Sequence, residues 1–179
     1  MTSTRTVYLI VCAASPAADA IVFIEHATAS AWDCHVIGTP AARKFLDIDA
    51  IETSSGNKVT FDHRRPNEAK RGRPPADMAV IAPATANTIN RLAAGIGGNY
   101  ALDVASELIG ANVPITIVPF VNTMLANRKP FQTALHSLKQ EGVHVLIEHE
   151  GSRPHSPRKG PEHRAVFPWK EALRDYSQT

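Results

Sequence analysis

The residues best suited to chemistry in this sequence are small hydroxyl side chains at the ends of apolar runs. Ser15, Thr39 and Thr85 each follow a strand-like run and precede a segment that reads as a helix. Each turn therefore offers a hydroxyl group together with the free backbone N–H groups of a helix start, and both favour the binding of a phosphate. Three such turns predict a cofactor that carries a phosphate group.

Continuous apolar runs alternate with helix-like segments along most of the chain. The run 6–12 is apolar almost throughout, which is typical of a strand covered on both faces. Such alternation predicts an α/β fold, with one doubly wound parallel sheet between two layers of helices. The carboxyl ends of the strands would bring the three turns to one edge of the sheet. The expected strands are 6–12, 33–38, 58–61, 78–82, 114–120 and 143–148, and the expected helices begin with Ser15, Thr39 and Ala84 or span 100–110 and 130–142.

The composition is that of an ordinary globular protein of 179 residues, with 44% hydrophobic and 20% charged residues. This length fits one domain, residues 1–179. The formal net charge of +2 provides no basic field for nucleic acid. No apolar run is long enough to span a bilayer, and the N-terminus lacks the pattern of a signal peptide. We therefore expect a cytoplasmic protein whose partners include neither nucleic acid nor a membrane.

The two cysteines and the missing glycine motifs narrow the choice of cofactor. Cys12 and Cys34 lie in apolar runs without metal-ligand spacing, so we expect two buried, reduced thiols and no metal. Neither G-x-G-x-x-G, typical of dinucleotide-binding folds, nor the phosphate loop G-x-x-x-x-G-K-[ST] occurs. A mononucleotide such as FMN is therefore favoured, with FAD as the alternative.

Residues 83–88, PATANT, resemble the Pro-Ala-Ser-Ala-Asn-Thr signature of the homo-oligomeric flavin-containing cysteine decarboxylases. Residues 119–126 resemble the second motif of that family, Pro-x-Met-Asn-x-x-Met-Trp, with departures at Val121, Leu125 and Ala126. The resemblance implies a flavodoxin-like (Rossmann-like) fold, FMN at a subunit interface, and a homotrimer or homododecamer. It also implies that the flavin oxidises a substrate cysteine, which then loses CO₂.

The resemblance also implies roles for individual residues. In the family, the asparagine of the second motif contacts the substrate carboxylate and a histidine before the first motif is catalytic, which points to Asn122 and His63. His63 lies twenty residues before Pro83 and could instead be a solvated loop residue, and Asn122 could instead be a helix N-cap. The residues implied to bind the cofactor are Ser15, Thr39, Pro83, Ala84, Thr85, Asn87 and Thr88; the first two and Thr85 could also be N-caps, and Asn87 could close a turn.

Residues 150–165 combine prolines, glycines and basic side chains, which predicts a surface loop. The resemblance implies that this loop is a substrate flap, in which Arg153, Arg158 or Lys159 could bind a peptide carboxylate or stay solvated. Family members of the coenzyme A pathway carry a cysteine in the flap, whereas this chain has none after Cys34. We therefore expect FMN-dependent oxidative decarboxylation of the C-terminal cysteine of a precursor peptide to an ene-thiol. The alternatives are a phosphopantothenoylcysteine decarboxylase and a flavin-binding protein without decarboxylase activity.

Overall fold

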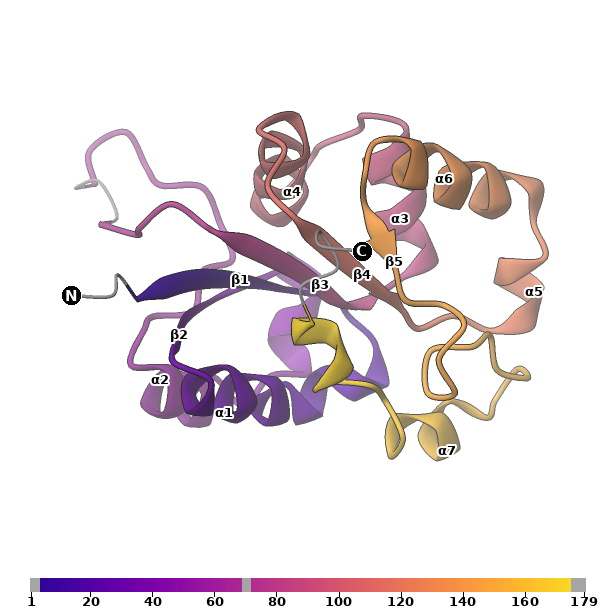
Figure 1. Ribbon diagram of the computed structural model, residues 1–179, viewed down its shortest axis with the longest axis horizontal. Helices are drawn as coiled ribbons and strands as arrows, with labels where there is room; N and C mark the ends of the chain where they lie inside the picture. The colour runs from indigo at the N-terminus through magenta and orange to yellow at the C-terminus, as the bar shows by residue number, and fades with distance from the viewer. Residues whose placement is uncertain (1–3, 69–71, 175–179) are drawn as a thin grey trace.

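The computed structural model describes residues 4–68 and 72–174, which form a five-stranded parallel sheet with its flanking helices (Figure 1). The strands lie in the order β2-β1-β3-β4-β5, and each neighbouring pair is parallel. This order confirms the doubly wound, flavodoxin-like α/β fold. The strands are β1 (Arg5–Val11), β2 (Trp32–Gly38), β3 (Met78–Ala84), β4 (Ile115–Pro119) and β5 (His144–Val145).

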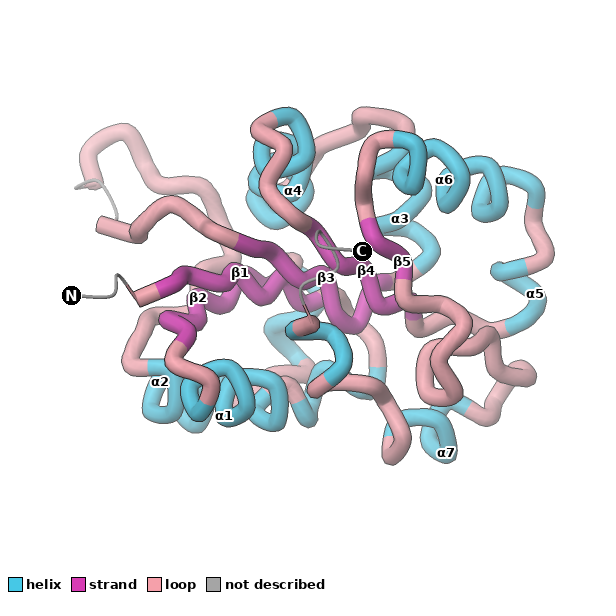
Figure 2. Tube along the Cα trace, in the orientation of Figure 1, coloured by secondary structure: helices cyan, strands magenta, loops and turns pink. Residues whose placement is uncertain are grey.

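Helices cover both faces of the sheet, which gives three layers (Figure 1, Figure 2). One face carries α1 (Ile21–Ala29) and α2 (Ile48–Ser55), and the other carries α3 (Ala86–Ala93), α4 (Tyr100–Gly110) and α6 (Lys129–Gln140). In the described ranges, no helix combines the length and the apolar character needed to cross a membrane. The short elements are α5 (Thr123–Ala126), α7 (Gly160–Arg164) and the 3-10 helices η1 (Ser15–Asp19), η2 (Pro40–Lys44) and η3 (Glu171–Leu173).

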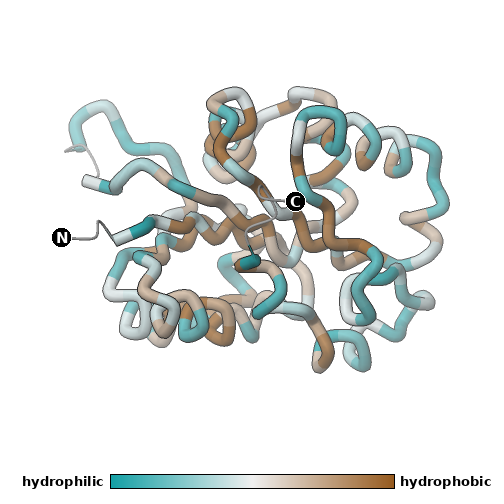
Figure 3. Tube along the Cα trace, viewed as in Figure 1, coloured by the Kyte–Doolittle hydropathy of each residue, from teal (hydrophilic) through white to brown (hydrophobic). Residues whose placement is uncertain are grey.

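Each face of the central strands packs into its own hydrophobic core. Leu9 of β1 belongs to the core that includes Phe23 and Ile24 of α1, whereas the next residue, Ile10, belongs to the core that includes Ile89 of α3. All five side chains are at most 1% exposed. Successive side chains of a strand point to opposite faces, so burial on both faces requires consecutive apolar residues. The central strands are accordingly hydrophobic along their length (Figure 3).

The prediction of a strand over residues 58–61 is wrong. This segment forms a single parallel bridge, between Thr60 and Ile37, at the outer edge of β2. Thr60 donates its N–H to the Val36 carbonyl at 3.0 Å and accepts the Gly38 N–H at 2.8 Å, and these are the backbone bonds that join the segment to β2. The N–H of Val59 donates to the Glu52 carboxylate at 3.0 Å.

Other bounds differ from expectation for local reasons. The last strand, expected over 143–148, is limited to β5, because the Ile147 N–H turns back to the Val145 carbonyl at 3.1 Å. The helix expected from Ala84 is α3, which starts after its N-cap Thr85. The first expected helix starts as η1 and continues as α1, and the second is the 3-10 helix η2.

Candidate cofactor and substrate site

The carboxyl ends of β1 and β3 lie side by side where the chain leaves the sheet toward opposite faces. After β1 it passes to α1, and after β3 it passes to α3 on the other face (Figure 1). Backbone bonds join these ends: the Cys12 N–H donates to the Pro83 carbonyl at 3.2 Å, and the Thr39 N–H donates to the Val11 carbonyl at 2.9 Å. Ligands of open parallel sheets bind in the crevice at such a point. The three turns expected to hold a cofactor therefore meet at one edge.

Ser15 has a buried hydroxyl group that lacks a hydrogen-bond partner in the described part of the chain. The expectation that it caps a helix is wrong, because the extended residue Ala14 takes the N-cap position of η1. Thr39 does occupy the N-cap position of η2, but its side chain makes no cap bond. A buried hydroxyl without a partner costs about 1–3 kcal/mol, which a ligand that bonds to it would offset.

Thr85 is the N-cap of α3, since its Oγ1 accepts the N–H of Thr88 at 3.3 Å. The Thr88 side chain is buried, with its hydroxyl 3.1 Å from Thr85 Oγ1, and it accepts a hydrogen bond from the Cys12 thiol at 3.3 Å. Burial raises the pKa of the Cys12 thiol, which keeps it protonated as the donor. Thr88 therefore supports Thr85 from the core side. Asn87, in contrast, is exposed on the first turn of α3.

Pro83 and Ala84 connect the PATANT segment to the neighbouring strands through backbone hydrogen bonds. The Pro83 carbonyl accepts the Cys12 N–H at 3.2 Å, and the Ala84 carbonyl accepts the Phe120 N–H at 2.8 Å. Both residues are buried, so they fix the turn against its neighbours and leave Thr85 as the first partly exposed side chain of the motif.

Asn122 is the N-cap of α5, with its Oδ1 accepting the Leu125 N–H at 3.0 Å. The interpretation of Asn122 as a helix N-cap is therefore confirmed for its Oδ1 atom. Within the residues described, the Nδ2 group has no acceptor, so its two N–H bonds remain for a ligand. One side chain can therefore start the helix and still donate a hydrogen bond at the edge of the sheet.

The loop 150–165 is anchored at two strand ends. Beside β4, the Thr123 N–H donates to the His155 carbonyl at 2.8 Å, and the His155 N–H donates to the Val121 carbonyl at 3.2 Å. Beyond β1, Arg164 donates to both carboxylate oxygens of Asp19, at 2.6 and 2.7 Å. The loop therefore runs from Asn122 to the turn that follows β1.

In the part of the chain that the structure describes, no hydrogen bond joins Arg153 or Arg158 to Asn122. Arg153 donates from Nε to the Glu148 carbonyl at 2.9 Å and lines a separate cavity against α6. Arg158 is exposed in a turn at a φ of 70°. Lys159 pairs with Glu162 at 2.6 Å on the surface.

His63 lies near the start of α4 and is paired with a residue that the sequence did not indicate. Its Nε2 is 2.9 Å from Oδ2 of Asp103, and its ring packs edge-on against Tyr100, with ring centroids 5.1 Å apart. The side chain of His63 is 62% exposed. Forty residues separate His63 and Asp103, so no local pattern could have shown their contact.

A comparison with known protein families identifies the chain. Residues 1–164 match the family model described as Flavoprotein. The chain belongs to the flavoprotein family. This membership confirms that the chain is a flavoprotein, as the PATANT segment indicated.

Solved decarboxylases share the fold of this flavoprotein. TvaF, an FMN-dependent cysteine decarboxylase from thioviridamide biosynthesis, has a TM-score of 0.73 and 20% identity, covering 91% of this chain and 99% of its own. EpiD complexed with the substrate peptide DSYTC has a TM-score of 0.64 and 18% identity, covering 79% of this chain and 80% of its own. Identities this low show a common fold.

Curated relatives are considerably longer than this flavoprotein. The coenzyme A biosynthesis bifunctional protein CoaBC of Haemophilus influenzae is 27% identical over 124 residues, which are 66% of this chain and 30% of that protein. The chain spans less than a third of the length of the curated relatives it matches.

The residues at this edge of the flavoprotein fit the phosphate of a flavin mononucleotide. A phosphate oxygen could accept the hydrogen bond that the buried Ser15 hydroxyl lacks, and the uncapped Thr39 position lies at the neighbouring turn. Thr85 then lies at the adjoining strand end. These positions would hold the flavin between the turns after β1, β2 and β3.

Proposed function

We propose that this flavoprotein binds FMN and oxidatively decarboxylates a cysteine at the C-terminus of a precursor peptide, giving an ene-thiol. Membership of the flavoprotein family supports the flavin, and TvaF is an FMN-dependent cysteine decarboxylase of the same fold. EpiD, also of this fold, was solved with a substrate peptide that ends in cysteine. The cofactor would be held by Ser15, Thr39, Thr85 and Asn87, while Pro83, Ala84 and Thr88 keep the turn in place.

In this reaction the cysteine loses its carboxyl group as CO₂ together with two hydrogens. The bond between Cα and the carboxyl carbon breaks, and the Cα–Cβ bond becomes a double bond that carries the thiol. Bound FMN supplies the acceptor for the two electrons. The chain itself must orient the carboxylate and accept the thiol proton.

Asn122 is suited to orient the carboxylate. Its Nδ2 group donates, while its Oδ1 is held by the Leu125 N–H. A neutral amide fixes the position of the carboxylate without adding a positive charge that would stabilise it and oppose the loss of CO₂. The flap bonds on either side of Asn122 hold its backbone in place.

His63 is suited to accept the thiol proton, with Asp103 as a positioning residue. If the Nε2–H donates to the Asp103 carboxylate, Nδ1 carries the lone pair and can act as the base. Tyr100 packs against the ring edge and restricts its rotation.

The absence of a thiol in the flap favours a peptide as the substrate over the substrate of the coenzyme A pathway. Cys12 and Cys34 are both buried at the sheet, and burial raises the pKa of the Cys34 thiol to about 12. Neither can approach a substrate at the flap as a thiolate. Without a thiol to reduce it, an ene-thiol is the end product.

A phosphopantothenoylcysteine decarboxylase is the second candidate, because the match to CoaBC favours it. The two reactions differ in their products. The coenzyme A pathway reaction releases CO₂ alone, whereas the proposed reaction removes CO₂ and two hydrogens.

The test is to purify the protein, identify its flavin by chromatography against FMN and FAD, and follow substrates by mass spectrometry. The substrates are a panel of peptides that end in cysteine, the same peptides ending in serine, and phosphopantothenoylcysteine. We expect bound FMN and the loss of CO₂ and two hydrogens from cysteine-terminated peptides only.

The other outcomes overturn the proposal in distinct ways. Loss of CO₂ alone from phosphopantothenoylcysteine, with no peptide turnover, would establish the second candidate. Bound flavin without turnover of any substrate would indicate a flavin-binding protein without decarboxylase activity. A protein that takes up no flavin would remove the basis of all three.

A further inference from the structure

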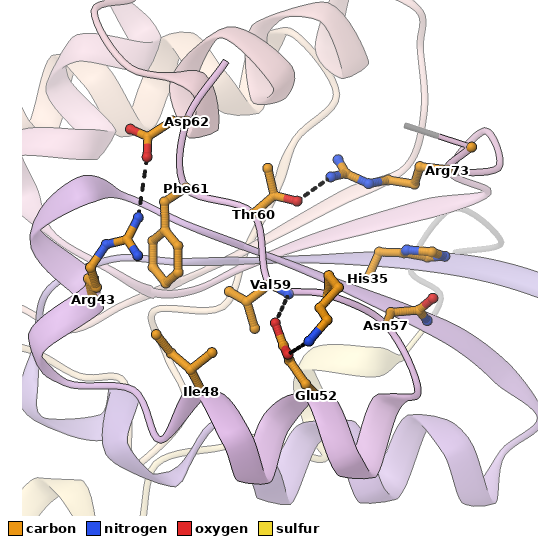
Figure 4. A pocket seen from close by; sticks show the side chains of 12 residues that line it. His35, Arg43, Ile48, Glu52, Asn57, Val59, Thr60, Phe61, Asp62 and Arg73 are labelled. Atoms are coloured by element: carbon orange, nitrogen blue, oxygen red, sulfur yellow. Dashed lines mark hydrogen bonds and ion pairs between the residues drawn. The ribbon is translucent and has the colours of Figure 1, made fainter. Parts of the chain in front are cut away.

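A cavity of about 530 Å³ lies beside the edge of the sheet, between the segment 57–62 and Arg73 (Figure 4). Ligand sites commonly have volumes of about 300–1,000 Å³. The cavity is lined mainly by polar and charged side chains, and His63 follows its lining residues Phe61 and Asp62 directly in the sequence. Its lining includes the charged or hydroxyl-bearing side chains Arg43, Glu52, Lys58, Thr60, Asp62 and Arg73.

The two carboxylates of the cavity are already compensated. Glu52 binds the Lys58 ammonium group and accepts the Val59 N–H at 3.0 Å. Asp62 pairs with Arg43 at 3.2 Å, and Figure 4 shows this pair. These pairs leave the net positive charge of the cavity at Arg73.

Arg73 is hydrogen-bonded to neutral hydroxyl groups. Its Nη2 donates to Thr60 Oγ1 at 2.8 Å, and its Nη1 donates to the Tyr100 hydroxyl at 3.2 Å. Among residues 4–68 and 72–174, no carboxylate lies within ion-pair distance of it. A half-buried guanidinium group with hydroxyl partners and unused donors is suited to receive a carboxylate.

Aromatic rings and a fixed backbone hold Arg73 in place. The guanidinium carbon is 5.2 Å from the centroid of the Tyr8 ring and 5.8 Å from that of Tyr100. The Tyr8 hydroxyl donates to the Pro74 carbonyl at 2.6 Å, and burial raises the pKa of Tyr8, which keeps this donor protonated. Asp77 accepts the Thr6 N–H at 2.7 Å further along. Because these contacts already order the segment after Arg73, binding would cost little additional ordering.

We infer that this cavity is a subsite for an acidic side chain of the substrate peptide, with Arg73 as the group that binds its carboxylate. The inference rests on the proposed peptide substrate. Tyr100 contacts both Arg73 and His63, so the subsite adjoins the residue proposed to accept the thiol proton. An acidic residue shortly before the terminal cysteine would occupy it.

The experiment measures peptide binding, which does not depend on turnover. Fluorescein-labelled peptides ending in cysteine carry a single Glu, or Gln in the control series, at one of the four positions before the cysteine. Fluorescence anisotropy gives the affinity for the FMN-loaded protein. We expect one Glu position to bind about tenfold tighter than its Gln counterpart.

Arg73→Met removes the charge but keeps much of the side chain, and it should abolish this preference. Lys58→Met is the matched control: it removes a cation that lines the same cavity but is paired with Glu52, and it should retain the preference. If Arg73→Met does not fold, Arg73→Lys keeps the charge without the planar fork and should reduce the preference.

Two results would overturn the subsite alone: equal affinity of wild type for Glu and Gln peptides at every position, or a preference that survives Arg73→Met or, failing that, stays undiminished in Arg73→Lys. Such results leave the proposed function intact if the peptides bind and are decarboxylated. If no cysteine-terminated peptide binds to the wild-type protein, the proposed function and the subsite both fail.

Discussion

The cofactor side of the candidate site is joined to the sheet by main-chain hydrogen bonds, whereas two parts of the proposed substrate side, His63 and the far end of the loop 150–165, are held by side-chain contacts. The turns at Thr39 and Pro83 are bonded through backbone atoms to β1 and the residue after it. His63 depends on Asp103, and the far end of the flap depends on Asp19 and Arg164. Main-chain bonds survive most substitutions, while side-chain contacts do not. Flavin binding and substrate turnover should therefore be separable by mutation.

The variant His63→Ala is expected to separate substrate turnover from flavin binding most strongly. Removal of a base lowers the rate by about 10²–10⁴-fold, while FMN should bind as before because His63 does not lie at the cofactor turns. Steady-state kinetics on a cysteine-terminated peptide and titration of apoprotein with FMN measure the two effects. His136→Ala, an exposed histidine on α6, is the control and should leave both unchanged. Full activity of His63→Ala would remove His63 from the mechanism.

Asp103→Asn also tests whether turnover can be lost without a loss of flavin binding. Its effect on turnover should be smaller than that of His63→Ala. Loss of the carboxylate leaves His63 present but less well oriented, so kcat should fall while KM stays constant. Asp103→Glu should restore part of kcat, and the ring nitrogen shifts of His63 in NMR should report the change of tautomer. An equal loss in Asp103→Glu and Asp103→Asn, with unchanged nitrogen shifts, would argue for a purely structural role.

Ser15→Ala tests the cofactor side. Loss of a hydrogen bond to a charged phosphate, worth about 1.5–3 kcal/mol, should weaken FMN binding at least tenfold. The apoprotein should melt at the same temperature or higher, because the variant removes a buried hydroxyl that has no partner in the described chain. Calorimetry measures both quantities, with the exposed Ser106→Ala as the control. Unchanged FMN affinity would mean that Ser15 does not bind the phosphate.

The smallest effect is expected at the anchor of the flap. Arg164 holds the pKa of the Asp19 carboxyl below its ordinary value. The pair therefore stabilises the fold above the ordinary aspartate pKa, and this stabilisation is lost as the pH falls through the lowered value. Asp19→Asn should cost no more than about 1 kcal/mol near neutral pH, since both side chains are partly exposed.

Urea unfolding across a pH series measures this difference, which should shrink in acid. Limited proteolysis should also cut the flap faster in Asp19→Asn. Glu162→Gln, which breaks an exposed pair within the flap, is the control. A difference that stays constant into acid would show that the ion pair is not its source.

Local sequence patterns predicted most of the fold because the features that set it are local. The apolar runs became the central strands, and Thr85 became an N-cap as its position suggested. The expectation for residues 58–61 was wrong because the backbone of this segment bonds to β2 through Thr60 alone, which forms one bridge and not a ladder.

The candidate site was only partly predictable, since several of its contacts join distant residues. The motif located Thr85 and Asn122, but Asp103 and Arg73 became visible only once the fold had brought them to His63 and Tyr100. The flap anchor joins residues 145 positions apart, which no spacing rule could reveal. The roles of the site residues remain predictions for the variants above.

The two backbone bonds from His155 to the neighbours of Asn122 have a thermodynamic consequence. Opening the flap at this point breaks both bonds and releases the backbone on either side of the amide. The free energy of opening and the affinity of the amide for its ligand are thus linked, and the linkage is reciprocal. A bound carboxylate should hold the flap closed, and release of product should require the flap to open.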